Sequence, residues 1–402
     1  MKAVILCGGL GTRLRPLTDT IPKVMVPIGG KPLIQRHIEW LVGNGIQDIG
    51  INLFYLPQVV KDHVKDGSQW GARIHYSHQD TLSGTAGDFR AFKDFVGDQQ
   101  CLVIYGDNLF SLDLNHFKEF HEAKKGTATI ALREWEDPTS KGIVGLDNEQ
   151  KILWFKEKPK PEEVTSTIGN AAIYILEPEL FSHIPDTGEV DFGMHTFPSL
   201  LEKNKHIYGY VLSTYHKDIG THEALQEARE DIQKIYPHKA VFLDRDGVLN
   251  KKPAVYDYVK SFEEFEWNPG AKELVKQIKE LGFLAVVISN QQGVGRGKMS
   301  AQFVNELHQK MQQDLVEYGT SIDGFYFCGH LRSDGCTCRK PQPGMLFRAA
   351  EQHGINLEKS FMIGDTITDM EAARKAGCTE IFIESDTINN ELEKILEILK
   401  KS

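Results

Sequence analysis

The sequence lacks any long hydrophobic run. A helix that crosses a membrane needs about 20 consecutive apolar residues, and the longest apolar runs, residues 4–7 and 284–289, are short enough to predict buried strands instead. The first residues lead directly into the strand expected at residues 3–7, which leaves no room for an export signal. We therefore expect a cytoplasmic protein with no membrane partner.

Basic residues are scarce relative to acidic ones. Lysine and arginine total 46 of the 402 residues against 56 aspartates and glutamates, which gives a formal net charge of -10. This balance argues against nucleic acid as the main partner. An acidic protein still binds small anions where its basic residues are concentrated in a site, so small-molecule substrates remain compatible with the composition.

Cysteine is also rare, with six residues in the chain. Three of these lie in or beside apolar stretches and are interpreted as buried small hydrophobic residues: Cys7, Cys101 and Cys378. The other three lie within eleven residues of each other beside a histidine. Without an export signal this clustering favours a metal over disulfides, and three thiolates with one imidazole predict a closed structural zinc site: Cys328, His330, Cys336 and Cys338.

The length suits two domains of about 150–250 residues each. Apolar strands at residues 3–7, 48–53 and 101–105 alternate with amphipathic helices, and the pattern restarts with a strand at residues 240–243. This alternation predicts α/β architecture with two doubly wound, mainly parallel sheets. We expect the domain boundaries as follows: residues 1–236, residues 239–385, and a C-terminal helix over residues 386–402.

A glycine-rich loop directly follows the first strand. Glycines let backbone N–H groups surround phosphate oxygens without interference from side chains, and cations follow closely at Arg13, Arg15 and Lys23. Leu14 stands where a dinucleotide-binding fingerprint needs its third glycine, and a P-loop would need Gly-Lys-Ser/Thr. The loop therefore predicts a nucleoside triphosphate site of another type.

A series of segments in the first 230 residues resembles the signature of the sugar-1-phosphate nucleotidylyltransferases. These segments are residues 8–33, 84–87, 106–107, 155–159, 169–171 and 217–221. The resemblance implies a Rossmann-like nucleotidyltransferase sheet, with a nucleoside triphosphate and a sugar phosphate as substrates. Such a reaction depends on positioning and on neutralising several negative charges.

The resemblance also implies roles for individual residues. Asp107 and Asp218 would hold Mg²⁺ at the α-phosphate, Arg13 would steady the departing pyrophosphate, and Lys23 would contact the triphosphate. The nucleotide would lie against Leu6, Gly8, Gly9, Gly11, Thr12, Gln79, Gly84, Thr85 and Asp107. The sugar phosphate would lie against Glu157, Lys158 and Asn170.

The identity of the base rests on Gln79. Its side-chain amide carries a donor and an acceptor, so it can pair with uracil, thymine or guanine. Relatives that take guanine often carry glutamate in this segment, and the glutamine departs from that pattern. We predict GMP transfer from GTP, with UTP and dTTP left open.

Four segments of residues 239–385 resemble the four motifs of the haloacid dehalogenase superfamily. Three of them directly follow apolar strands and one supplies cations, and they contribute Asp244 and Asp246, Ser289, Lys340, and Asp365 and Asp369. The resemblance implies a Rossmannoid sheet and a magnesium-dependent phosphatase. Aspartate at the second position of the first motif fits a phosphatase.

On this resemblance Asp244 attacks phosphorus and becomes an aspartyl phosphate, while Asp246 protonates the leaving oxygen and then activates water. Mg²⁺ would be held by Asp244, the backbone carbonyl of Asp246, and Asp365. Ser289 and Lys340 would hold the transferred phosphoryl group.

Within that superfamily, residues 245–250, 289–297 and 338–345 resemble the D-glycero-D-manno-heptose 1,7-bisphosphate 7-phosphatases. Arg296 and Arg339 would hold the second phosphate of a bisphosphate, beside Asn290. Histidinol-phosphate phosphatases share the Cys/His loop and remain an alternative.

The two halves constrain each other. A heptose bisphosphatase yields heptose 1-phosphate, which a nucleotidylyltransferase can consume, so we expect consecutive steps of nucleotide-activated heptose synthesis. Mannose and glucose 1-phosphate remain alternatives for the sugar. A regulatory first domain that senses ligand without turnover is disfavoured because Arg13, Lys23, Asp107 and Asp218 are all present. The sequence leaves open whether the chain forms a homo-oligomer.

Overall fold

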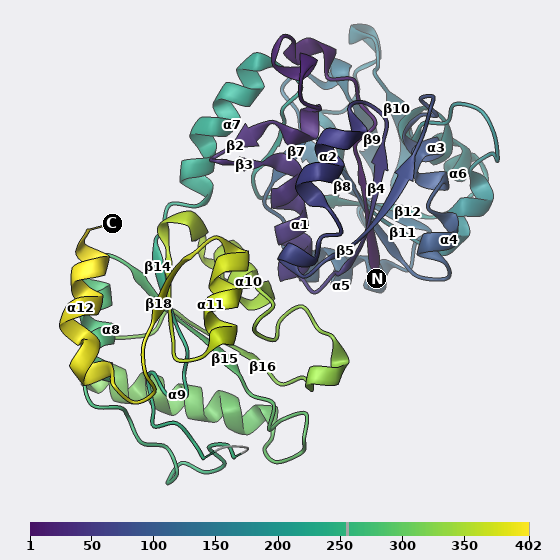
Figure 1. Cartoon of the computed structure of the whole chain (residues 1–402). Helices are drawn as coiled ribbons and strands as arrows, with labels where there is room; N and C mark the ends of the chain where they lie inside the picture. The colour runs from purple at the N-terminus through teal and green to yellow at the C-terminus, as the bar shows by residue number, and fades with distance from the viewer. Residues whose placement is uncertain (255–256, 402) are drawn as a thin grey trace. The chain divides into compact units, whose positions relative to one another are not determined.

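The computed structural model describes residues 1–254 and 257–401. The chain forms two compact units (Figure 1). The first consists of Met1–Ile38, Ile46–Ser68 and Ala72–Ile235, and the second of Tyr236–Ser402 grouped with Glu39–Gly45 and Gln69–Gly71. Among the described residues, no helix is both long enough and apolar enough to cross a membrane.

A nine-stranded mixed sheet forms the centre of the first unit. Its strands lie in the order β10-β9-β11-β6-β1-β4-β5, and β8 joins β12 to β11. Four adjacent strands are parallel: β1 (Lys2–Leu6), β4 (Asp48–Leu53), β5 (Arg73–His78) and β6 (Cys101–Tyr105); β12 also runs parallel to β8. The remaining strands are β8 (Ala128–Glu134), β9 (Gly142–Leu146), β10 (Ile152–Glu157), β11 (Ile168–Leu176) and β12 (Ile207–Val211).

The later strands of this sheet correct the expectation of a mainly parallel arrangement. β11 runs antiparallel to β6, β8 and β9, and β9 runs antiparallel to β10. The connection between β9 and β10 is a short turn, and a short turn returns the chain antiparallel, whereas a parallel crossover needs a dozen or more residues. The strand at residues 101–105 agrees with the structure, and the strand expected at residues 3–7 lies one residue earlier.

Helices and two short ribbons complete the first unit. The helices are α1 (Leu33–Gly43), α2 (Pro57–Val64), α3 (Thr85–Arg90), α4 (Lys93–Val96), α5 (Leu114–Lys124), α6 (Phe197–Glu202) and α7 (His222–Ile235). One ribbon pairs β2 (Pro27–Ile28) with β3 (Lys31–Pro32), and the other pairs β7 (Asn108–Phe110) with β13 (His216–Asp218). An aromatic cluster fills the core, where Phe89 stacks on Phe181 with ring centroids 4.6 Å apart.

The second unit is built on a five-stranded, fully parallel sheet in the order β16-β15-β14-β17-β18. Its strands are β14 (Ala240–Leu243), β15 (Leu284–Asn290), β16 (Gly324–Cys328), β17 (Phe361–Gly364) and β18 (Thr379–Phe382). Its helices are α8 (Ala271–Glu280), α9 (Ala301–Glu317), α10 (Gly344–His353), α11 (Ile367–Ala376) and α12 (Ile388–Lys400). The carboxyl ends of β14, β15 and β17 meet at one edge, where ligands of such sheets bind.

The C-terminal helix belongs to the core of the second unit. Ile388, Ile395 and Leu399 of α12 are buried in the same cluster as Leu274 and Ile278 of α8. Their spacings of seven and four residues place them on one apolar face of the helix. The helix therefore packs on the second unit through this face; residue 402 lies outside the described residues.

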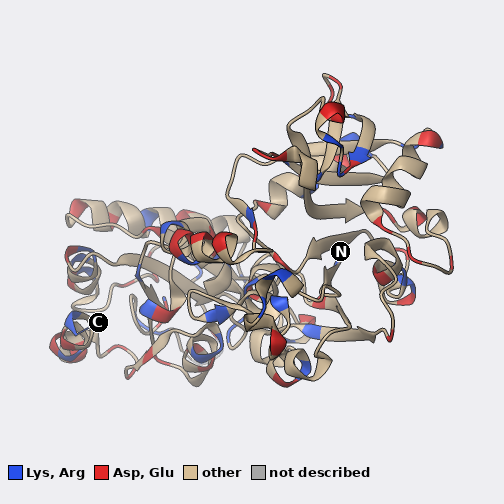
Figure 2. Cartoon of the chain, turned by 90° about the horizontal axis from the view of Figure 1, so that it is seen from above, with Lys and Arg blue, Asp and Glu red and all other residues tan. Residues whose placement is uncertain are grey.

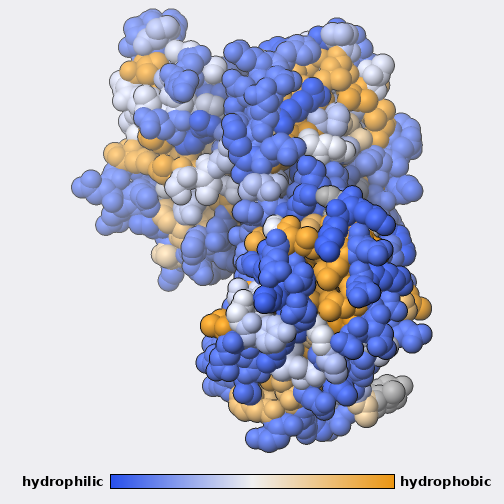
Figure 3. Space-filling view, turned by 90° about the vertical axis from the view of Figure 1, so that its left-hand side faces the viewer, coloured by the Kyte–Doolittle hydropathy of each residue, from blue (hydrophilic) through white to orange (hydrophobic). Residues whose placement is uncertain are grey.

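The surface carries mixed charge and scattered apolar groups. In Figure 2, Lys and Arg lie among Asp and Glu in both units. In Figure 3, hydrophobic residues form separate patches within a mainly hydrophilic face. Isolated patches of this kind are ordinary for folded proteins.

Two candidate active sites

The β7–β13 ribbon brings two distant aspartates of the first unit together. Asp218 pairs with Asn108 across the ribbon, and the backbone N–H of Ile219 donates to the carbonyl of Asp107 at 3.1 Å. The ammonium of Lys23 lies 2.6 Å from Asp107 Oδ2 and 3.3 Å from Asp218 Oδ1. The two carboxylates therefore converge on one cation, and their hard oxygen atoms suit Mg²⁺.

Two lysines hold Asp218 in its ionised form. Burial alone would raise the pKa of Asp218, but Lys23 and Lys141 lower it to about 2. The ammonium of Lys141 lies 2.7 Å from Asp218 Oδ2. Lys141 was not expected from the sequence, because it belongs to none of the recognised motifs.

The glycine loop is tightly packed against its surroundings. A Cβ added at Gly8 would lie 2.6 Å from Asp88 Oδ2, and Gly11 adopts a positive φ of 64°, which favours glycine. Thr12 begins the short turn that carries Arg13. A Cβ added at Gly220 would lie 2.6 Å from Arg13 Nη2, so Arg13 reaches the segment that carries the ribbon aspartate.

A cavity of about 320 Å³ opens beside this loop. It is lined by seven of the expected residues: Leu6, Gly8, Gly9, Lys23, Gly84, Thr85 and Asp107. Gly11, Thr12 and Gln79 are not among its described lining residues. The lining also includes acidic residues that the sequence did not single out: Asp88, Glu189 and Asp191.

A hydrogen-bonded chain connects Gln79 to this cavity. The hydroxyl of Ser83 lies 2.8 Å from both Gln79 Oε1 and Asp88 Oδ1, and the amide of Asn52 donates to Asp88 Oδ2 at 2.8 Å. Burial raises the pKa of Asp88. Gln79, the residue expected to read the base, is therefore linked through Ser83 to a buried carboxyl group, a link that no sequence motif indicated.

The expected sugar-phosphate residues lie at the end of β10 and in β11, on either side of β9. Burial raises the pKa of Glu157, and a Cβ added at Gly193 would lie 2.3 Å from its carboxylate. The backbone N–H of Lys158 donates to the carbonyl of Lys141 at 2.9 Å. Asn170 donates to the hydroxyl of Tyr174 at 2.8 Å, where the register of β11 shifts.

In the second unit, Lys340 binds two aspartates from different elements, Asp244 directly after β14 and Asp369 in α11. Its ammonium lies 2.8 Å from Asp244 Oδ1 and 2.6 Å from Asp369 Oδ1, and it donates to the carbonyl of Ile288 at 2.7 Å. All of these groups are buried. Burial, opposed by Lys340, raises the pKa of Asp244 to about 7.

The same edge of the sheet fits a divalent cation. Carboxylate oxygens of Asp244, Asp365 and Asp369 lie within 4.8 Å of one another. Asp365 Oδ1 is buried and has no hydrogen-bond partner among residues 1–254 and 257–401. A buried carboxylate oxygen without a donor is costly unless a cation occupies the space beside it.

Asp246 is held apart from this trio by its own partners. The guanidinium of Arg245, which is fully buried, donates to its carboxylate at 2.9 Å, and Asn250 donates at 3.0 Å. Gln291 donates to Asp246 Oδ2 at 2.8 Å and to the hydroxyl of Ser289 at 2.7 Å. Gln291 therefore links the expected acid–base residue to the expected phosphate ligand.

The four Cys/His side chains gather as the spacing predicted. Sγ of Cys336 lies 3.7 Å from that of Cys328 and 3.5 Å from that of Cys338, and His330 Nδ1 lies 3.2 Å from Cys338 Sγ. Bonds of about 2.3 Å from zinc to sulfur give tetrahedral edges of roughly 3.7 Å. The cluster therefore has a size that fits zinc.

A cationic cavity of about 390 Å³ lies between the Cys/His loop and Lys340. Arg332 and Arg339 line it, and its described lining residues include no aspartate or glutamate. Arg339 Nη1 is buried without a hydrogen-bond partner in the described parts of the chain. Arg296, expected beside Arg339, is exposed and does not line this cavity in the described structure, whereas Arg332 was not expected.

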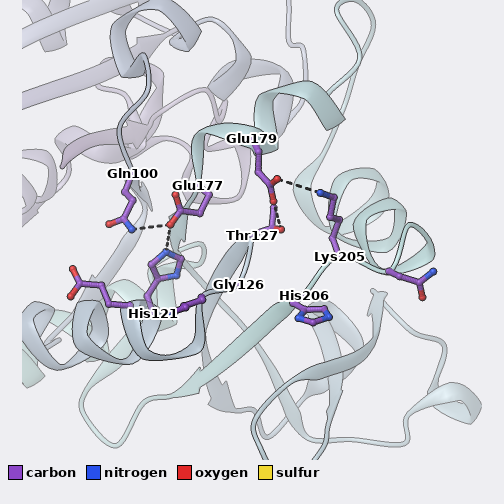
Figure 4. Close-up of a pocket in the computed structure, with 11 residues that line it drawn as sticks. Gln100, His121, Gly126, Thr127, Glu177, Glu179, Lys205 and His206 are labelled. Atoms are coloured by element: carbon purple, nitrogen blue, oxygen red, sulfur yellow. Dashed lines mark hydrogen bonds and ion pairs between the residues drawn. The ribbon is translucent and has the colours of Figure 1, made fainter.

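A third cavity, of about 470 Å³, contains none of the expected site residues among its described lining (Figure 4). Its polar groups satisfy each other. His121 bonds to Thr129 at 2.7 Å and to Glu177 at 3.1 Å, while Thr127 and Lys205 both donate to Glu179. These contacts tie α5 and the neighbouring loops to the sheet and leave the two phosphate-type sites as the candidates.

Comparisons with known families agree with this division of the chain. Residues 2–235 match the nucleotidyl transferase family, and residues 337–397 match a HAD-hydrolase-like family. A solved structure of a Bacillus anthracis protein described as a glucose-1-phosphate thymidylyltransferase is 31% identical with a TM-score of 0.53, and the match covers 57% of this chain and 94% of that one.

Curated relatives match each half separately. A UTP–glucose-1-phosphate uridylyltransferase of Synechocystis sp. is 36% identical, covering 55% of this chain and 60% of its own length. A mannose-1-phosphate guanylyltransferase of Mycobacterium tuberculosis is 33% identical, over 58% of this chain and 64% of its own. A D-glycero-beta-D-manno-heptose-1,7-bisphosphate 7-phosphatase of Helicobacter pylori is 44% identical over 35% of this chain and 79% of its own.

Proposed function

The chain belongs to the nucleotidyl transferase family, and we propose that it is a bifunctional enzyme acting on sugar phosphates at two separate sites. The second unit hydrolyses a phosphate ester, and the first couples a sugar 1-phosphate to a nucleotide. The observation that carries this proposal is that each unit contains a buried lysine bound to carboxylates at the end of a strand or ribbon: Lys23 with Asp218, and Lys340 with Asp244. Each cluster is suited to holding a phosphate together with Mg²⁺.

In the second unit, a carboxylate oxygen of Asp244 attacks the phosphorus and the bond to the sugar oxygen breaks. Asp246 gives a proton to that oxygen, and then takes one from the water that hydrolyses the aspartyl phosphate. Lys340 and the hydroxyl of Ser289 bind the phosphoryl oxygens. Asp244, Asp365 and the Asp246 carbonyl would hold Mg²⁺, which would supply positive charge beside the transferred phosphoryl group.

The cationic cavity beside Lys340 receives the second phosphate of the substrate. Arg339 Nη1 is buried and unpaired in the described residues, and Arg332 lines the same space. Two guanidinium groups in a space whose described lining holds no carboxylate favour a dianion, which they bind through paired N–H donors. A bisphosphate is therefore preferred over a monophosphate of the same sugar.

In the first unit, a phosphate oxygen of the sugar 1-phosphate attacks the α-phosphorus of a nucleoside triphosphate. The bond to the bridging oxygen breaks and pyrophosphate leaves with the electron pair, so no proton transfer is required. Arg13 and Lys23 neutralise the triphosphate, and Glu157, Lys158 and Asn170 position the sugar phosphate. Asp107 and Asp218 would hold Mg²⁺, which would supply positive charge at the α-phosphate.

The substrates follow from the pairing of the two units. Removal of the 7-phosphate from D-glycero-D-manno-heptose 1,7-bisphosphate leaves heptose 1-phosphate, which the first unit joins to GMP from GTP. The heptose is supported by the name of the Helicobacter pylori relative, and guanine by that of the Mycobacterium tuberculosis relative. A first unit that uses glucose 1-phosphate with UTP is the second candidate, which the Synechocystis relative favours.

One experiment tests the proposal and separates the two sites. The protein is incubated with Mg²⁺, heptose 1,7-bisphosphate and each nucleoside triphosphate in turn, and phosphate, pyrophosphate and nucleotide sugar are measured. Asp244→Asn is expected to abolish phosphate release and leave transfer to supplied heptose 1-phosphate, and Asp107→Asn to do the reverse. A single substitution that silences both reactions in a folded protein would contradict the proposal of two sites.

A further inference from the structure

Lys141 occupies the first site without an assigned role. We propose that Lys141 is a phosphate-binding residue of this site, whose ammonium holds the phosphate of the incoming sugar 1-phosphate between Asp218 and the Glu157–Lys158 segment. This inference rests on the nucleotidyl transfer proposed above, and it adds a residue outside the recognised motifs.

The contacts place Lys141 at the metal-binding end of the site. Its ammonium lies 2.7 Å from Asp218 Oδ2, while Lys23 lies 3.3 Å from Asp218 Oδ1. The two oxygens of one carboxylate thus each face a different lysine. Lys23 also lies 2.6 Å from Asp107, so its ammonium contacts both aspartates. It is more buried than Lys141, with a side chain only 9% exposed.

The side chain of Lys141 is held in place by an aromatic ring. Its ammonium lies 4.4 Å from the ring centroid of Trp135, and its side chain is 21% exposed. A cation over an indole face is attracted by the ring and loses little when part of its water is removed. An ammonium has three N–H donors, so the bond to Asp218 leaves it able to donate to an anion.

The backbone of Lys141 is joined to the sugar-phosphate segment. Its carbonyl accepts from the N–H of Lys158 at 2.9 Å, and the next residue, Gly142, pairs with Glu157 across β9 and β10. Lys141 is therefore the residue at which the metal-binding ribbon meets the strand that carries the sugar ligands.

Nucleotidyl transfer needs a cation beside the attacking phosphate of the sugar 1-phosphate. Two anions approach each other when the sugar phosphate attacks the α-phosphate, and their repulsion must be offset on the side of the nucleophile as well as on the side of pyrophosphate. In the proposed function, Arg13 and Lys23 neutralise the triphosphate. Lys141 supplies the positive charge beside the attacking sugar phosphate. A purely structural role would only neutralise the Asp218 carboxylate.

The test compares Lys141→Met and Lys141→Arg with Arg133→Met. Arg133 is the matched control because its guanidinium lies 4.5 Å from the same Trp135 ring but donates to the carbonyl of His216 instead of binding Asp218. Initial rates are measured against sugar 1-phosphate, nucleoside triphosphate and Mg²⁺ separately. Binding of glucose 1-phosphate to the full-length protein is measured by calorimetry.

We expect Lys141→Met to raise the KM for sugar 1-phosphate, and to weaken glucose 1-phosphate binding, by about 10- to 100-fold, as loss of a charged hydrogen bond implies. The KM for nucleoside triphosphate and the Mg²⁺ dependence should change by less than about twofold, and Lys141→Arg should recover most of the loss. Arg133→Met should leave all these constants near those of the unmodified protein.

Two results would overturn the inference. One is a Lys141→Met protein with unchanged affinity for sugar phosphate. The other is a Lys141→Met protein whose Mg²⁺ requirement rises together with every KM. That result would mean that Lys141 only neutralises the charge of the Asp218 carboxylate. If the unmodified protein transfers no nucleotide, the proposed function fails by itself, and the glucose 1-phosphate titrations still decide whether Lys141 binds phosphate.

Discussion

Asn290 and Lys340 hold each other through two reciprocal hydrogen bonds. The amide of Asn290 donates to the carbonyl of Lys340 at 3.0 Å, and the N–H of Lys340 donates to Asn290 Oδ1, also at 3.0 Å. The pair joins the end of β15 to the segment that follows the Cys/His loop. Asn290 therefore fixes the backbone from which Lys340 reaches Asp244, even though the two residues are 50 positions apart.

Replacing Asn290 by alanine is expected to lower the kcat/KM of phosphate release by about 10- to 100-fold, because both bonds that position Lys340 are lost. Nucleotidyl transfer should be unchanged. Steady-state assays of both reactions check this, with Asn305→Ala on the exposed face of α9 as the control. An equal loss of both activities would show that the effect is not local.

Three of the four phosphatase-like motifs predicted from the sequence directly follow apolar runs. Asp244, Ser289 and Asp365 stand at the ends of β14, β15 and β17, and a parallel sheet brings the ends of its strands to one edge. The Cys/His cluster was predictable for a similar reason, since ligand type and spacing constrain a tetrahedral site. At these positions the local sequence pattern was sufficient to predict where the side chains lie.

The residues that were not predicted are placed by long-range packing. Lys141 contacts Asp218, which lies 77 residues later in the chain, and the sequence around Lys141 does not indicate that contact. Arg332 lines the cationic cavity because the loop around the Cys/His cluster folds back on it. The antiparallel strands of the first sheet were missed because their apolar residues do not by themselves record strand direction.

Removing one ligand of the Cys/His cluster should impair the phosphatase alone. Cys336→Ser is expected to lose the metal, about one zinc per chain, and to raise the KM for the bisphosphate because the loop carrying Arg332 and Arg339 loses its anchor. Metal content by atomic absorption and both activity assays check this. Cys378→Ala, outside the cluster, should keep its zinc. A zinc-free variant with normal phosphatase kinetics would refute the link.

The turn at Gly84 should tolerate no side chain. Its φ is +75° and an added Cβ would lie 2.7 Å from the carbonyl oxygen of Val190, so Gly84→Ala is expected to cost about 2–4 kcal/mol and to weaken nucleotide binding. Gly97 is the matched control, with φ +61° and nothing within 4 Å of an added Cβ. Gly97→Ala should cost only its backbone strain, about 1–3 kcal/mol, and should leave nucleotide binding unchanged. Both variants strain the backbone, but only Gly84→Ala brings the added Cβ against Val190. Thermal unfolding and nucleotide titration of both variants therefore separate the cost of backbone strain from the cost of that contact.

Two buried histidines should make the first unit sensitive to acid. His37 donates to the carbonyl of Asn108 at 2.8 Å, and His216 donates to that of Ala171 at 2.7 Å, so both brace the ribbon that carries the metal-binding aspartates. Burial lowers the pKa of His37 and of His216 to about 4 in each case. Both rings are therefore neutral in the folded protein near pH 6.

The sign of the effect follows from the unfolded chain, where histidine titrates near pH 6.5. As the pH falls from about 6.5 to about 4, these histidines become protonated in the unfolded state but stay neutral in the folded state. The free energy of unfolding therefore falls across this range, by on the order of 3 kcal/mol per histidine. Calorimetric unfolding as a function of pH measures the loss. His37→Gln and His216→Gln retain a donor without titrating and should flatten the profile, whereas His116→Gln, with an exposed ring, should not. An unchanged profile in the double variant would assign the acid sensitivity to other groups.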